Sequence, residues 1–124
     1  MKKQLILFAH GSNDPKWKKP FELLEEKLKK TLGDESVSLA YLERSSPTLI
    51  ETINNAKKNG VNCLKILPLF MAGGSHIEND LPKLINEMRN KYPDINIEIL
   101  TPIGENPVIA ETIYQVALSL FVTT

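Results

Sequence analysis

The chain has 124 residues, the length of one domain with a single core. Fifteen acidic and fifteen basic side chains cancel, so the overall charge gives no reason to expect nucleic acid as a partner. No apolar run approaches the roughly 20 residues of a membrane span, the N-terminal run is too short for a signal peptide, and the lone Cys63 excludes an intramolecular disulfide. We expect one cytoplasmic domain over residues 1–124, without membrane contact.

The first half of the chain predicts two strands, each followed by a helix. Residues 4–9 form a continuous apolar run, typical of a buried parallel strand. Asp14 and Pro15 can then act as the N-cap and first residue of a helix, whose apolar stripe stops near Gly33. A second strand is predicted over residues 37–42, and the sequence Ser45-Ser46-Pro47 is expected to start the second helix.

The third strand is predicted over residues 61–70, after a left-handed Gly60 that closes the second helix. Its regular part should end near Pro68, because proline cannot donate a hydrogen bond to a neighbouring strand. Pro82 should lie in the first turn of the third helix, so we expect that helix to begin near Asn79 or Asp80.

An edge strand over residues 95–100 and a last helix from Asn106 and Pro107 to about Phe121 complete the pattern. Four alternating strands and helices predict an α/β fold with a four-stranded parallel sheet and helices on both faces. Apolar residues occupy most of the circumference of the last helix. This apolar surface is larger than the helix needs to pack on one face of a sheet. We expect part of that helix to contact another subunit, the alternative being a partly exposed terminus.

The two histidines of the chain each follow an apolar run and lie in Gly/Ser-rich loops, in the sequences AHGS and AGGSH. Because the carboxyl ends of parallel strands meet at one edge of the sheet, His10 and His76 are expected to converge there. Two imidazoles with a carboxylate, for which we favour Glu43, suit Co²⁺, Ni²⁺, Fe²⁺ or Zn²⁺ and leave open coordination positions. The alternatives are hydrogen-bonded structural histidines and a surface ion pair for Glu43.

The loop of Gly73, Gly74 and Ser75 predicts an anion-binding turn before a helix, and Ser45 can act similarly. Neither loop is a Walker A sequence, the first loop lacks the GxGxxG spacing, and there is no GxSxG motif. We therefore expect no organic cofactor.

Three segments, LFAHGSNDP, YLERSSPTLIETI and LPLFMAGGSHIENDLP, together resemble the signature stretches of the small class II tetrapyrrole chelatases, the CbiX-type sirohydrochlorin cobaltochelatase and ferrochelatase family. The similarity extends over nearly the whole chain, including GENPVIAE before the last helix. The resemblance implies a chelatase-like domain of flavodoxin-like βα repeats. It also implies a homodimer, because larger members contain two such units around one cleft.

The resemblance implies that a divalent metal is inserted into sirohydrochlorin, in cobalamin or sirohaem synthesis. Cobalt is the expected metal substrate, with iron or nickel as alternatives. His10 and His76 would hold the metal, and an imidazole or Glu43 would accept the pyrrole protons. The carboxylates of the macrocycle would be bound by the loop residues Ser12, Arg44, Ser45, Gly73, Gly74 and Ser75.

Two other functions remain open from the sequence. The same histidines would serve a carrier that binds metal or tetrapyrrole without joining them. A histidine-phosphatase-like hydrolase is less well supported, because Ala9 stands where that chemistry needs an arginine, and the whole chain has only Arg44 and Arg89.

Overall fold

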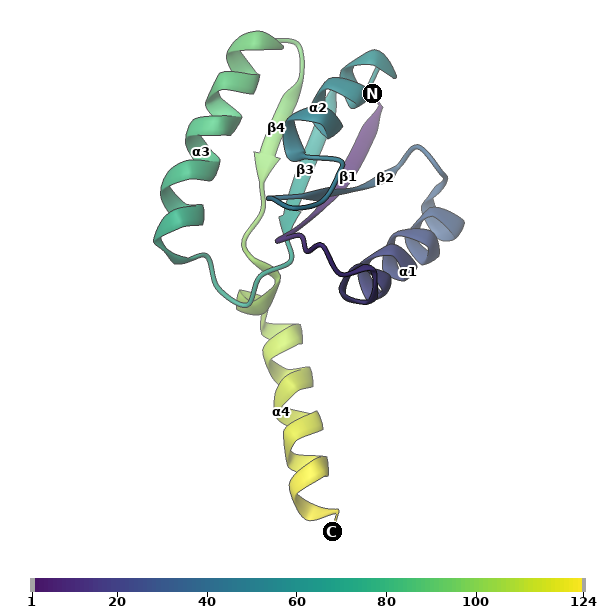
Figure 1. Cartoon of the computed structure of the whole chain (residues 1–124), viewed down its shortest axis with the longest axis vertical. Coiled ribbons are helices and arrows are strands. Elements are labelled where there is room, and N and C mark those ends of the chain that lie inside the picture. The colour runs from purple at the N-terminus through teal and green to yellow at the C-terminus, as the bar shows by residue number, and fades with distance from the viewer. Residues whose placement is uncertain (1, 124) are drawn as a thin grey trace.

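Four parallel strands form the centre of the molecule, namely β1 (Lys3–Ala9), β2 (Val37–Tyr41), β3 (Cys63–Pro68) and β4 (Asn96–Ile99). The structure is a computed structural model that describes residues 2–123, apart from the side chains of Ser75 and His76. The strand order is β2-β1-β3-β4, so β1 and β3 are central and β2 and β4 lie at the edges (Figure 1). The predicted four-stranded parallel sheet is confirmed.

Helices cover both faces of the sheet, as predicted. The helical elements are α1 (Pro15–Leu32), α2 (Leu49–Lys58), α3 (Gly74–Lys91), a short 3₁₀ helix η1 (Ile103–Glu105) and α4 (Pro107–Val122). Helices α2 and α3 lie on one face, α1 lies on the other, and α4 projects away from the body of the molecule (Figure 1).

The alternation of side chains along the strands separates two apolar clusters. On one face, Phe8 and Ile66 pack with Ile53 of α2 and Ile85 of α3, all of them fully or almost fully buried. On the other face, Leu7 and its neighbours in β2 pack under α1, which has no fully buried residue of its own. The main core therefore lies between the sheet and the pair α2 and α3.

Two predicted helix starts are confirmed by their caps. The Asp14 carboxylate accepts a hydrogen bond from Lys16 N at 2.9 Å, and Asn106 accepts one from Val108 N at 2.9 Å. In both cases a proline follows the cap directly, at a position where the helix needs no N–H donor. The predicted stop at Gly33 is also observed.

The predicted start of the second helix at Ser45-Ser46-Pro47 is wrong by a few residues. The N-cap is Thr48, whose hydroxyl accepts from Glu51 N at 3.2 Å while the Glu51 carboxylate accepts from Thr48 N at 3.2 Å. This reciprocal capping box satisfies two N–H groups, and it follows the T-x-x-E spacing that the sequence contains.

The third helix begins earlier than predicted, at Gly74 rather than near Asn79. Pro82 therefore lies inside α3, where it deprives the Glu78 carbonyl of its helical donor. Pro82 and Glu78 are both exposed, so water can replace that hydrogen bond and the helix continues through the proline. No helix within residues 2–123 has the length and apolar character that a membrane span requires.

Candidate functional site

His10 lies where β1 ends, at the carboxyl edge of the sheet, and its side chain is exposed. Its ring is 4.3 Å from the ring of Phe70, centroid to centroid, with an interplanar angle of 55°. Phe70 is buried and also meets Phe8 edge-on at 5.7 Å. The imidazole therefore rests on a ring fixed in the core, while its outer side remains open.

Glu43 is brought next to His10 through the backbone, as the parallel order of β1 and β2 predicts. Glu43 N donates to His10 O at 3.0 Å, continuing the ladder in which Leu42 N donates to Ala9 O at 2.8 Å. The side chain of Glu43 is exposed. A carboxylate and an imidazole thus extend from adjacent chain segments at one edge.

Gly11 allows this close approach of the two loops. It has a φ of 97°, and a Cβ atom added there would lie 1.8 Å from Glu43 O. Only glycine fits between the segments without displacing the carbonyl.

Ser12 and Ser45 also come together as predicted for residues of one site. Ser12 N donates to Ser45 Oγ at 3.0 Å, and Ser45 Oγ donates to Ser12 O at 2.7 Å. The Ser45 hydroxyl is thereby used to join the two loops. Arg44, between Glu43 and Ser45, is exposed and has a φ of 60°, a left-handed conformation that is uncommon outside glycine.

Gly73 and Gly74 form the entry to α3 from the end of β3. Gly74 has a φ of 75°, which favours glycine, and Ser75 and His76 follow it in the first turn of α3. The side chains of Ser75 and His76 lie outside the described residues, so the predicted meeting of the two imidazoles stays a prediction. Along the chain, His76 follows six residues after Phe70, whose ring contacts His10.

The third and fourth loops are joined in the same way as the first two. Gly104 N donates to Phe70 O at 3.0 Å, and a Cβ atom on Gly104 would lie 2.1 Å from Met71 O. A pocket of about 300 Å³ lies between these loops and is lined by Gly73, Glu78 and Glu105 among others. The four loops at the carboxyl edge are therefore joined by close backbone contacts in two pairs, the first with the second and the third with the fourth.

Metal binding at this edge, through His10, His76 and Glu43, stays a prediction. Among the described residues, which lack the His76 side chain, no group of three His, Cys, Asp or Glu side chains is arranged to hold a metal ion. Sequence reasoning missed Phe70 as the support of His10. The signal for this contact is the apolar run before the AGGSH sequence. That run forms β3, which pairs in parallel with β1, so the residues that follow the two strands lie side by side.

Comparison with known proteins assigns the family. Residues 4–119 match the CbiX family model. The chain is 31% identical over 117 residues to a sirohydrochlorin cobaltochelatase of Saccharolobus islandicus (strain L.S.2.15 / Lassen #1), with 90% of each chain covered. It is 27% identical over 129 residues to the protein of the same name from Methanopyrus kandleri, covering 88% of this chain and 90% of that one.

Solved structures agree in fold. A CbiX protein from Marinobacter aquaeolei VT8 is similar with a TM-score of 0.84 and 34% identity, over 98% of this chain and 99% of that chain. The sirohydrochlorin chelatase SirB from Bacillus subtilis subspecies spizizenii, in complex with cobalt, has a TM-score of 0.80 at 24% identity, and the match covers 96% of this chain but 51% of SirB. From the extent of these matches, the chain belongs to the CbiX family.

Proposed function

We propose that this protein inserts a divalent metal ion into sirohydrochlorin, with cobalt as the preferred metal and iron or nickel as alternatives. The observation that carries the proposal is the pairing of His10 with Glu43 at the carboxyl edge of β1 and β2, in a chain of the CbiX family. The relatives named sirohydrochlorin cobaltochelatase support the choice of macrocycle and of cobalt.

In the proposed reaction, His10 and His76 bind the incoming ion through neutral imidazole nitrogens, which suit borderline divalent metals. Insertion exchanges the divalent ion for two pyrrole protons of the macrocycle, so charge is conserved when both protons leave. In this proposal Glu43 accepts a proton, and its exposure lets that proton pass to water. Two or three protein ligands hold the ion weakly enough to release it to the macrocycle.

The carboxylates of sirohydrochlorin require positive charge and N–H donors near this edge. Arg44 supplies the charge, since its guanidinium is exposed and has no ion-pair partner among the described residues. The backbone of Gly73, Gly74 and Ser75 at the start of α3 and the hydroxyl of Ser12 are the proposed N–H and O–H donors.

The test is the rate of cobalt insertion into sirohydrochlorin, followed by absorption against the uncatalysed rate. His10→Ala, His76→Ala and Glu43→Gln should each lower kcat at least about a hundredfold, whereas Glu26→Gln, an exposed carboxylate on α1, should leave it unchanged. Full rates in both histidine variants would refute the assignment. A protein that binds sirohydrochlorin or Co²⁺ but does not exceed the uncatalysed rate would be a carrier.

We also propose that two copies form the working unit, and α4 supports this. Its apolar side chains are open to solvent, with Leu120 71% and Phe121 84% exposed. The α1 side of the sheet is covered only over its β1 and β2 half. On the other half, Lys65 and its register partner Glu98 are exposed and Leu67 is only partly buried.

In the proposed homodimer, α4 of each copy packs on the uncovered half of the other copy's sheet. The connection from β4 to α4 is short, and η1 within it is fixed to the third loop by the hydrogen bond from Gly104 N to Phe70 O. This favours packing of α4 on the other copy over folding of α4 back onto its own sheet. Sedimentation equilibrium should give a dimer for the native chain and a monomer for Ile113→Glu/Leu120→Glu. The control, Ser119→Glu, changes an exposed polar position of the same helix. A native chain that is monomeric at micromolar concentration would refute this part of the proposal.

A further inference from the structure

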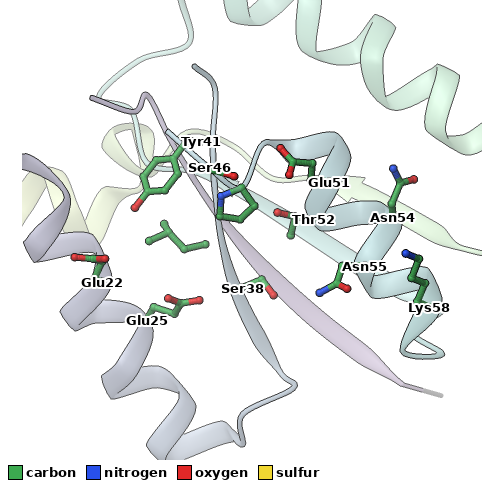
Figure 2. A pocket seen from close by; sticks show the side chains of 12 residues that line it. Glu22, Glu25, Ser38, Tyr41, Ser46, Glu51, Thr52, Asn54, Asn55 and Lys58 are labelled. Carbon is green, nitrogen blue, oxygen red and sulfur yellow. The ribbon is translucent and has the colours of Figure 1, made fainter. Parts of the chain in front are cut away.

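A groove of about 560 Å³ lies beside the edge strand β2, between α1 and α2, and His10 does not line it. Figure 2 shows Glu22 and Glu25 of α1 on one side of it and Asn54, Asn55 and Lys58 of α2 on the other. Its floor includes Ser38, Leu39 and Tyr41 of β2. The proposed metal insertion uses no residue of this groove.

The backbone of β2 is open along the groove. Leu42 N donates to Ala9 O of β1 and Tyr41 N donates to Pro47 O, so odd-numbered residues of β2 direct their N–H groups away from β1. The same alternation turns the N–H and C=O of Leu39 to the outer edge, where neither has a partner among the described residues. At the carboxyl end of β2, Thr48 already forms a parallel bridge with Tyr41 on this edge.

The walls of the groove carry an excess of negative charge. Glu22, Glu25 and Glu51 line it, against the single amine of Lys58. Glu25 also pairs with Lys29 at 3.3 Å. Glu22 has no ion-pair partner among the described residues, so its carboxylate is available to a cation.

Tyr41 provides a hydrogen-bonding group at the wall of the groove. The residue as a whole is 3% exposed and its hydroxyl makes no hydrogen bond to any described residue, but the phenol oxygen itself reaches solvent in the groove. Figure 2 shows the phenol oxygen directed to the side of the groove formed by Glu22 and Glu25. Burial raises the pKa of this phenol, and the two carboxylates raise it further, so the group stays a neutral hydrogen-bond donor. The phenol oxygen is therefore free to donate a hydrogen bond to a molecule bound in the groove.

We propose that the groove binds an extended, lysine-bearing segment of a partner protein, which adds to the sheet as a fifth strand beside β2. Exposed sheet edges are established sites of strand addition. Side chains of an added strand alternate between its two faces. Cationic side chains would meet Glu22, Glu25 and the Tyr41 hydroxyl on the α1 side, and the residues between them would meet Asn54 and Asn55 on the α2 side.

The test uses the full ¹⁵N-labelled chain and the hexapeptide acetyl-KTKTKT-amide, followed by amide chemical shifts. The peptide should shift the Leu39 amide and its neighbours in β2 with a saturable dependence on concentration. The same peptide N-methylated at alternate residues keeps its charge but loses the hydrogen bonds of one edge, and it should not bind. Glu22→Gln/Glu25→Gln should weaken the native peptide about fivefold, and Glu26→Gln/Glu87→Gln, which removes two carboxylates outside the groove, should leave its affinity unchanged.

Three results would overturn the proposal. Equal binding of the N-methylated peptide would show charge attraction without strand pairing. Spermidine, which has the same charge of +3, would identify a small-cation site if it produced the same shifts at the same affinity. Shifts spread over other acidic surfaces, or none in β2, would remove the groove as the docking place.

Discussion

Replacing Gly11 by alanine tests whether the contact between the first two loops holds the site together. The added Cβ atom would lie 1.8 Å from Glu43 O, and real Cβ contacts essentially never fall below 3.0 Å. The Glu43 carbonyl must therefore retreat by at least 1.2 Å, the difference between those two distances. Such a shift strains the neighbouring hydrogen bond from Glu43 N to His10 O.

The expected loss of stability has two parts. Alanine in the left-handed conformation of Gly11 costs about 1–2 kcal/mol. Loss of the hydrogen bond between the loops adds about 1 kcal/mol. We expect the free energy of unfolding to fall by about 2–3 kcal/mol, and kcat for cobalt insertion to fall because His10 and Glu43 separate.

Gly60→Ala is the matched control. Gly60 also has a positive φ, of 78°, but nothing lies within 4 Å of an added Cβ atom there. The conformational cost and the reduced entropy of the unfolded chain are similar in the two variants, so their difference isolates the clash. Urea unfolding followed by circular dichroism gives the stability and the cobalt assay gives kcat. If Gly11→Ala matched Gly60→Ala in both measurements, the reasoning would be refuted.

Three further changes follow from the same structure. Phe70→Leu should cost about 1–3 kcal/mol of stability, because it shortens a buried side chain that packs edge-on against Phe8. It should lower kcat about tenfold or more, because His10 loses the ring on which it rests; an unchanged kcat would remove Phe70 as a support. Thr48→Ala should lower the free energy of unfolding by about 1 kcal/mol through loss of the capping box, while Thr31→Ala, near the end of α1, should change it by less than half of that amount in the same urea experiment. The pKa of Tyr41 is raised in the folded state, so the folded chain keeps this proton as pH rises above the ordinary value of 10.0, whereas the unfolded chain loses it. The native protein should therefore lose stability above that pH more steeply than Tyr41→Phe. Urea titrations of both proteins between pH 8 and 11 would contradict this if their stabilities fell in parallel.

Features set by local patterns could be predicted from the sequence. Apolar runs located the four strands, and Asp14-Pro15 and Asn106-Pro107 located two helix starts, because an Asx cap followed by proline satisfies or removes the first N–H groups locally. The Thr48 capping box is equally local, but the two serines before Pro47 offer the same cap chemistry, so the sequence predicts a helix start a few residues too early. The start of α3 at Gly74 differs from the prediction for another reason: proline is typical of the first turn of a helix, but an exposed helix such as α3 can continue through Pro82.

Features that depend on contacts between distant segments could be predicted only in outline. The sheet edge that brings His10 and Glu43 together followed from parallel topology, but the ring of Phe70 beneath the imidazole did not. The apolar circumference of α4 indicated a subunit contact, but the sequence alone gave no reason to expect the helix to project from the body (Figure 1). Its direction depends on how η1 is fixed to the third loop.

The way in which the loops are joined has a consequence for metal transfer. The contacts that fix the carboxyl edge use main-chain groups at Glu43, His10, Gly104 and Phe70, with the Ser45 hydroxyl as the side-chain exception. Among the described residues, neither the imidazole of His10 nor the carboxylate of Glu43 makes a hydrogen bond that joins two loops, so in the proposed reaction both can bind the ion, release it and take up protons without breaking the hydrogen bonds of the fold. An insertion reaction needs such freedom, since each turnover must break the bonds between the protein and the metal. If His10 and Glu43 serve metal insertion as proposed, main-chain fixation separates the stability of the site from its affinity for the ion. Replacing His10 or Glu43 should then alter metal transfer far more than the free energy of unfolding.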